Sequence, residues 1–173
     1  MNETEQFVLE VKKKFGEARP RGDLLGWDLN RFFSSFTRIC TYCRVNNCTD
    51  LNYSYCNSYE IEPETQPQEF DYVLTFKTSF IVDAYSYHVT RYSKNRRNGR
   101  VINLPDCGEV AEFSDVSTAQ KAIKQALNAI EQFVQQNGFR EVDEHDQDIV
   151  IDGVSLELSD VATLGRCLFD DFE

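Results

Sequence analysis

Cysteines are the most concentrated chemically reactive residues of the chain. Four of the six lie in one stretch, ICTYCRVNNCTDLNYSYC, residues 39–56. They are Cys40, Cys43, Cys48 and Cys56, with the spacing C-x2-C-x4-C-x7-C. One C-x2-C pair can hold one side of a zinc ion, but specific zinc patterns add a second such pair or an H-x3-5-H, which this stretch lacks. The spacing leaves zinc binding open without favouring it.

The same stretch also fits the apolar face of a helix. Apolar residues recur at spacings of three and four, which predicts a helix over about 28–44. The stripe consists of Leu29, Phe32, Phe33, Phe36, Ile39, Cys40 and Cys43. Asp28 would cap this helix, and Trp27 with Phe32 has the spacing of a hydrophobic staple. The end of the helix stays open, because TRICTYCRV also alternates as a strand does.

We therefore favour the first two cysteines as small buried side chains. Metal binding and disulfide chemistry are the alternatives, although a cytosolic chain keeps its thiols reduced.

Residues for catalysis are scarce. The only histidines are His88 and His145, and neither stands in a nucleophile elbow or another catalytic motif. The chain also lacks HExxH, a phosphate-binding glycine loop and a dinucleotide fingerprint. We expect a binding protein that is not an enzyme and that uses no cofactor.

The middle of the chain reads as an antiparallel sheet. Residues alternate between apolar and polar in segments 51–61 and 69–77, and in the second segment Phe70, Tyr72, Leu74 and Phe76 share one face. A third strand is expected within 80–92 and a fourth within 101–105, joined by a hairpin turn at Asn98-Gly99.

Helices flank this sheet on both sides in the sequence. A capping box at Asn2 and Glu5 predicts a first helix that ends at Gly16. A long helix is expected from Ser117 to Asn137-Gly138, with a core-facing stripe. That stripe is Ile123, Ala126, Leu127, Ile130, Phe133 and Val134.

The remaining segment predicts short elements. FREV, residues 139–142, reads as a short strand, and DIVIDGVSLEL reads as a tight hairpin about Asp152-Gly153. Ser159 would cap a last helix that turns Val161, Leu164, Cys167 and Leu168 inward. The sequence thus predicts a single α+β domain over residues 1–173, with an antiparallel meander packed by about four helices.

The composition of the chain indicates its cellular compartment and the charge of its partner. The chain has 173 residues, 41% of them hydrophobic, and a formal net charge of −11. It shows no secretory signal and no apolar run long enough for a membrane span, so we expect a cytoplasmic protein. The negative charge opposes binding to nucleic acid or to an anionic membrane and favours a basic partner.

The negative charge is concentrated near the C-terminus. Residues 141–173 hold eleven Asp or Glu against one Arg. The candidate partner-binding residues are Glu141, Asp143, Glu144, Asp146, Asp148, Asp170, Asp171 and Glu173. Asp143, Glu144, Asp146 and Asp148 crowd one predicted loop, and the last three lie at the C-terminal end of a helix, where the helix dipole disfavours anions. A cationic partner would offset the repulsion within the loop and the unfavourable helix dipole. Calcium is the weaker hypothesis, because DEHDQDIVIDG lacks the EF-hand pattern.

Basic residues gather at the predicted hairpin tip RYSKNRRNGR, next to aromatic residues of the preceding strand. Basic and aromatic residues together are typical of single-stranded nucleic-acid platforms. A zinc-binding regulatory or nucleic-acid-associated module, built on this tip and the four cysteines, is therefore the alternative function.

The compact acidic α+β character, the aromatic strands and the acid-rich segment SLELSDVATLGRCLFDDFE resemble the small immunity proteins that bacteria keep against their own contact-dependent or polymorphic toxins. The likeness lies in the general character of the whole chain. It implies an inhibitor that covers the basic active-site cleft of a cognate toxin, with nucleases as the expected class. An acidic surface would complement such a cleft and speed encounter. The six cysteines depart from what is expected of that group and keep the metal reading open.

Overall fold

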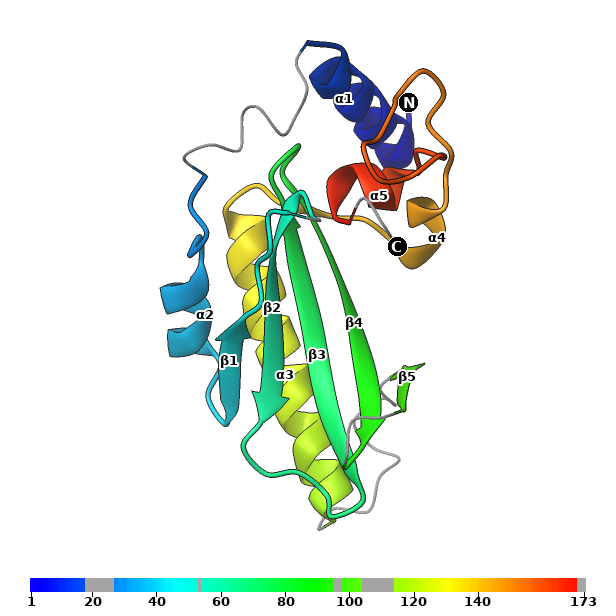
Figure 1. Ribbon diagram of the computed structural model, residues 1–173. Coiled ribbons are helices and arrows are strands. Elements are labelled where there is room, and N and C mark those ends of the chain that lie inside the picture. Colours follow the sequence, from blue (N-terminus) through cyan, green and yellow to red (C-terminus); the bar gives the residue numbers. More distant parts are fainter. Residues whose placement is uncertain (18–26, 53, 95–97, 104–113, 171–173) are drawn as a thin grey trace.

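The chain folds as an α+β structure in which helices cover one face and one end of a mostly antiparallel sheet (Figure 1). The computed structural model describes residues 1–17, 27–52, 54–94, 98–103 and 114–170. The described residues form six strands and five helices, so the predicted fold class is confirmed and the helix number is slightly higher than expected.

The sheet is a meander in chain order. Its strands are β1 (Cys43–Asn47), β2 (Cys56–Pro63), β3 (Phe70–Ser79), β4 (Ala84–Ser93) and β5 (Gly99–Ile102), each antiparallel to the next. The short strand β6 (Arg140–Glu141), predicted from FREV, pairs in parallel with the beginning of β4. This parallel pairing brings the start of the acid-rich segment 141–173 to the edge of the sheet.

The long helix α3 (Asp115–Gln136) lies along one face of the sheet (Figure 1). Its predicted stripe packs into the main core, together with the predicted face of β3. The helix begins earlier than the capping box at Ser117 implied, because the side chain of Ser114 accepts a hydrogen bond from the Ser117 backbone N–H at 3.1 Å. It ends as predicted at Asn137, before Gly138 with a φ of 86°.

The predicted helix over 28–44 is wrong at both ends. Helix α2 spans only Phe33–Ile39 and begins after Phe32, which has a left-handed φ of 66° and makes no side-chain cap. The chain leaves the helix at Cys40 and turns at Tyr42, with a φ of 67°, into strand β1. Pairing with β2 satisfies the backbone of this segment, which is why the strand-like alternation prevails over the helical one.

The expected cap and staple of that helix are also absent from the described structure. Asp28 accepts from the Asn30 backbone N–H at 2.9 Å in a local turn. The ring of Trp27 packs on Phe80, with ring centroids 4.4 Å apart, whereas Phe32 packs on Phe133 and its neighbours.

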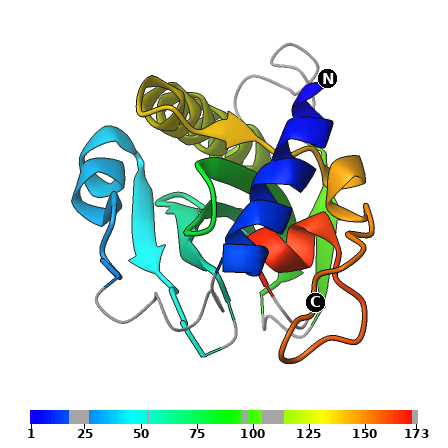
Figure 2. The same ribbon diagram turned by 90° about the horizontal axis from the view of Figure 1, so that it is seen from above.

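A second core closes the end of the sheet. Helix α1 (Glu3–Glu17) and helix α5 (Leu164–Leu168) lie side by side over that end, next to the one-turn helix α4 (Glu144–Gln147), as the view from above shows (Figure 2). The predicted capping box at the start of α1 is present, since Asn2 and Glu5 exchange backbone-to-side-chain hydrogen bonds of 2.8 and 2.9 Å.

The two predicted hairpin turns differ from their expected geometry. Gly153 does turn the chain, with a φ of 82°, but the pairing that follows is one bridge between Val150 and Thr163. Thr163, not Ser159, caps the last helix, and Val161 stays exposed. At the other turn, Gly99 already lies in β5 opposite Tyr92, so Asn98-Gly99 is not a two-residue turn.

Candidate protein-binding surface

The structure separates the four cysteines of the predicted zinc pattern. Cys40 and Cys43 are buried in the main core, as expected for small apolar side chains, although Cys43 comes from a strand. Cys56 belongs to the second core and Cys48 is exposed. Within the described ranges, no group of three or more His, Cys, Asp or Glu side chains is arranged to hold a metal ion.

Burial also determines the state of the core thiols. It raises the pKa of Cys40 to about 12, with a further contribution from neighbouring Cys43. It raises the pKa of Cys43 to about 11, and the charge of Glu64 adds to this. Both thiols are therefore protonated at neutral pH, whereas a zinc ligand or a nucleophile acts as the thiolate.

Carboxylates from four elements meet beside the pairing of β6 with β4. Burial raises the pKa of the Glu141 carboxyl, and the charges of Glu131, Asp143 and Glu3 raise it further. These four residues, called the acidic cluster below, come from α1, α3, β6 and the residue that caps α4. Mutual repulsion at close range is the electrostatic signature of a surface that favours a cation.

Two tyrosines of β4, Tyr85 and Tyr87, interact with these carboxylates and are themselves uncharged at neutral pH. The hydroxyl of Tyr85 donates to Glu131 Oε1 at 3.1 Å and accepts from Gln135 Nε2 at 2.8 Å. Burial, helped by Glu141, Glu131 and Asp143, raises the pKa of Tyr87 to about 12. Neither phenol adds charge at neutral pH, so the carboxylates alone set the potential here.

Three of the predicted contact residues lie close together at α4, and one of them, Asp143, belongs to the acidic cluster. Asp143 caps α4 by accepting from the His145 backbone N–H at 2.9 Å and remains exposed. Glu144 follows it and is also exposed. Asp146 is only partly exposed to solvent, and its carboxylate accepts a hydrogen bond from the hydroxyl of Thr4 at 2.7 Å. The region predicted as an acidic loop is thus a short capped helix docked on α1.

The other predicted contact residues lie elsewhere. Asp170 forms an ion pair with Lys77 in which both side chains are mostly buried, so it contributes little free negative charge. Asp148 lines a hollow that Lys77, Arg166 and Asp170 also line, where charges of both signs are balanced. Asp171 and Glu173 lie outside the described residues.

The acidic cluster contains two residues that the sequence did not single out. Glu3 and Glu131 are far from the C-terminal segment in sequence and join it only because β6 pairs with β4. No local pattern marks them. Sequence position alone therefore assigned too much of the clustered negative charge to the C-terminal end. It missed the carboxylates that α1 and α3 supply.

Three described residues of the predicted nucleic-acid platform, Tyr85, Arg91 and Lys94, are engaged in contacts within the protein. Tyr85 is buried and stacks on Phe76, with ring centroids 5.2 Å apart. Arg91 covers the ring of Phe70 at 4.5 Å, and Lys94 pairs with an acid of β3. Arg96 and Arg97 lie outside the described residues.

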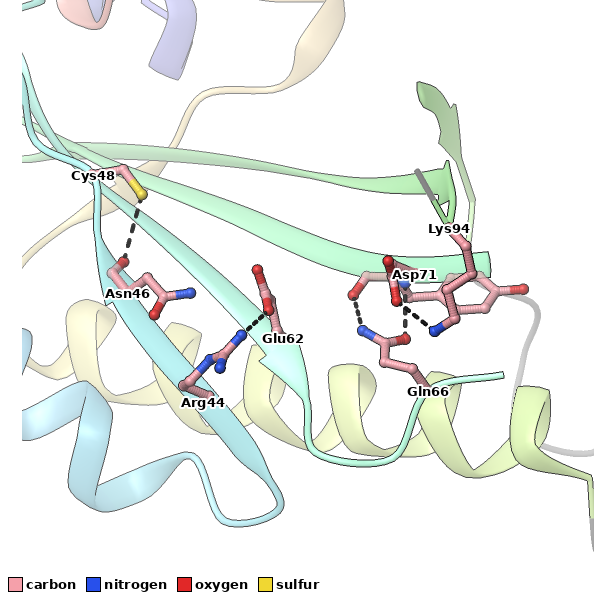
Figure 3. A network of polar contacts seen from close by, with 8 residues as sticks. Arg44, Asn46, Cys48, Glu62, Gln66, Asp71 and Lys94 are labelled. Carbon is pink, nitrogen blue, oxygen red and sulfur yellow. Dashed lines mark hydrogen bonds and ion pairs between the residues drawn. The ribbon is translucent and has the colours of Figure 1, made fainter. Parts of the chain in front are cut away.

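The face of the sheet opposite α3 carries a polar network (Figure 3). Arg44 donates to Glu62 Oε2 at 2.6 Å, and Lys94 donates to Asp71 Oδ1 at 2.9 Å. Gln66 bonds both backbone groups of Tyr72 at 2.9 Å. The charges on this face pair with one another, so it is a weaker candidate for binding a charged partner than the acidic cluster.

Comparison of the chain with protein-family models, curated proteins and solved structures found no match. Among the helices of the described ranges, none combines the length and the apolar character needed to cross a bilayer.

Proposed function

We propose that the protein is a non-catalytic binding protein that neutralises a basic partner, and that the partner is a toxin whose cationic active-site cleft it covers. The acidic cluster, extended by Glu144, is the proposed contact surface. The nuclease class of the partner and a cytoplasmic site of action belong to the same proposal and come from the resemblance to immunity proteins.

The observation that carries this proposal is the convergence of carboxylates from four separate elements. Exposed charges that merely solvate a surface can spread apart, whereas here the fold holds Glu141 among Glu131, Asp143 and Glu3 and raises its pKa. Such a focused negative potential speeds the encounter with a positively charged surface. A nucleic-acid substrate of the partner would be excluded by the same charges.

Neutralising the contact surface tests the proposal directly. The triple variant Glu141→Gln, Asp143→Asn and Glu144→Gln keeps the shape of each side chain, and asparagine can still cap α4. A partner captured from the native host should be basic, and its association with this variant at low salt should be slower by about tenfold or more. Stopped-flow or surface kinetics measures that rate.

A matched control separates the local surface from the net charge. Glu17, Glu64 and Glu69 are exposed and lie outside the acidic cluster, so their change to glutamine alters the net charge by the same amount. We expect this control to associate almost as fast as the native chain. Equal slowing in both triples, or a captured partner that is not basic, would contradict the proposed surface.

A further inference from the structure

An apolar groove lies along the outer side of α1, at the border of the second core. Its volume is about 470 Å³, which is in the range of ligand-binding pockets. Its apolar lining comes from Met1, Val8, Leu9 and Ile149. Helix α1 turns Phe7 and Val11 toward the second core. Leu9, midway between them in the sequence, therefore lies on the opposite side of the helix and is 54% exposed. Val8 and Ile149 also pack against the second core, whereas Leu9 is turned away from it and leaves an exposed apolar side chain in the groove.

Acidic residues flank the groove. Glu5 is part of its lining, and Thr4, also in the lining, donates to Asp146 Oδ2 at 2.7 Å. The negative side chains therefore come from α1 on one side and from the α4 segment on the other. Glu3 of the acidic cluster lies in the same first turn of α1.

We propose that this groove receives the apolar face of a short, basic amphipathic helix of a partner protein. This inference rests on the proposed function and specifies how the basic partner is held. Apolar side chains of the helix would enter between Leu9 and Ile149, while flanking Lys or Arg residues meet Glu5 and Asp146. An apolar groove with carboxylates beside it is an arrangement that can recognise such helices.

The geometry favours a helix over an added strand. The wall formed by α1 presents side chains, because backbone groups inside a helix are bonded within it. The groove therefore offers no strand edge along α1 to which an extended segment could pair. Recognition must proceed through apolar anchors and rim charges.

The charge of the chain disfavours two other occupants. A second copy would also carry −11, and the facing acidic rims would repel each other. An anionic membrane surface would be repelled in the same way. A cationic amphipathic segment satisfies both the apolar lining and the acidic rim.

A model peptide tests the groove without the native partner. The probe is a helical peptide of about 14 leucines and lysines with one apolar face, compared with a shuffled peptide of the same composition that has none. The amphipathic peptide should bind the full chain more tightly than the shuffled one. Leu9→Gln should weaken it by about tenfold, mainly through faster dissociation, whereas Glu5→Gln should slow association and reduce its salt dependence.

Leu29→Gln is the matched control, because Leu29 is also a large exposed apolar residue and does not line the groove. Thermal melting of each variant verifies that it is folded. Glutamine at position 5 can still accept the capping hydrogen bond, so the start of α1 is kept. Equal binding of both peptides, or equal loss in Leu9→Gln and Leu29→Gln, would overturn the inference. Self-association of the chain that Leu9→Gln abolishes would also overturn it, since the occupant would then be a second copy.

The experiments can contradict the groove and the toxin-neutralising role independently of each other. If neutralising the acidic cluster slows the captured partner while Leu9→Gln changes neither its association nor its dissociation, the groove is wrong and the binding function stands. If Leu9→Gln releases the amphipathic peptide while no basic partner is captured, the groove stands and the toxin-neutralising role is wrong.

Discussion

Burial decides what each described thiol can do at the scale of single residues. Cys40, Cys43, Cys56 and Cys167 are buried, and Cys48 is exposed. The sequence showed that cysteines are concentrated, and helical spacing correctly indicated that the first two are core residues. It could not show that Cys56 belongs to a different core, because that follows from where β2 meets α1 and α5. The spacing of these cysteines is compatible with zinc ligands and also with buried core residues. Only the positions of the thiols in the structure distinguish the two.

Alkylation of the folded protein tests this assignment. At pH 8, iodoacetamide should label Cys48 at least about tenfold faster than Cys40 or Cys43, because the buried thiols carry raised pKa values and are shielded. Labelling of Cys48 should still accelerate as the pH rises, since burial and the charge of Glu60 raise its pKa. Peptide mapping by mass spectrometry reads each cysteine separately, including Cys107.

The unfolded protein in urea is the control, where all thiols should react alike. Labelling of Cys40 in the folded state at the rate of Cys48 would contradict its burial. About one zinc per purified chain, together with protection of Cys48, would instead restore the metal-binding hypothesis.

At the scale of elements, the long patterns of β3 and α3 were predictable, whereas the stretch that forms α2 and β1 was not. The alternation in β3 and the stripe of α3 repeat often enough to specify both element and buried face. The stretch 28–44 contains both periods, and the outcome depends on a left-handed turn at Tyr42 and on pairing with β2. Pairing partners lie outside any local window, which is why propensity could not place α2 and β1.

Close packing of α4 on α5 gives a prediction at this scale. A Cβ atom at Gly165 would lie 2.9 Å from Gln147 Cβ and 3.2 Å from the Gln147 backbone oxygen. Gly165→Ala should therefore lower the free energy of unfolding by about 1–3 kcal/mol, despite the better helix propensity of alanine. Urea denaturation followed by circular dichroism measures the change.

Gly16→Ala provides the comparison within another helix. Among the described residues, apart from the chain neighbours and the backbone of α1 itself, no heavy atom lies within 4 Å of a Cβ at Gly16, so alanine there should raise the free energy of unfolding by about 0.5–1 kcal/mol. If both substitutions stabilise the protein to the same extent, α4 and α5 do not pack as closely as described. The acid-bearing α4 would then lack the fixed position on which the candidate surface depends.

At the scale of the whole molecule, the fold redistributes the charge that the sequence concentrates near the C-terminus. Asp170 is neutralised by Lys77, while Glu3 and Glu131 are brought in from α1 and α3. The excess of eleven acids over one arginine in residues 141–173 was visible in the sequence. Which of them act together was not, because charge positions in space follow from the parallel pairing of β6 with β4.

This convergence predicts a specific pH dependence of stability. The pKa of Glu141 is raised in the folded state, so the carboxyl favours folding below its unfolded pKa of about 4.3 and loses that contribution as the pH rises through the folded pKa. At neutral pH the ionised group is therefore disfavoured, first by its partial burial and then by repulsion from Glu131, Asp143 and Glu3. Glu141→Gln should raise the free energy of unfolding at pH 7 by on the order of 0.5 kcal/mol, a small gain because Glu141 is exposed and solvent screens its charge.

The gain of Glu141→Gln should shrink toward zero as the pH falls to 4, where the native carboxyl is protonated, and it should also shrink in high salt. Glu69→Gln removes an exposed carboxylate outside the acidic cluster and should show little gain at either pH. Denaturant titrations of the three proteins at several pH values measure these differences. A gain for Glu141→Gln that is equal at pH 4 and pH 7 would mean that repulsion does not cause it, and the acidic cluster would then lack the focused potential that a cationic partner needs.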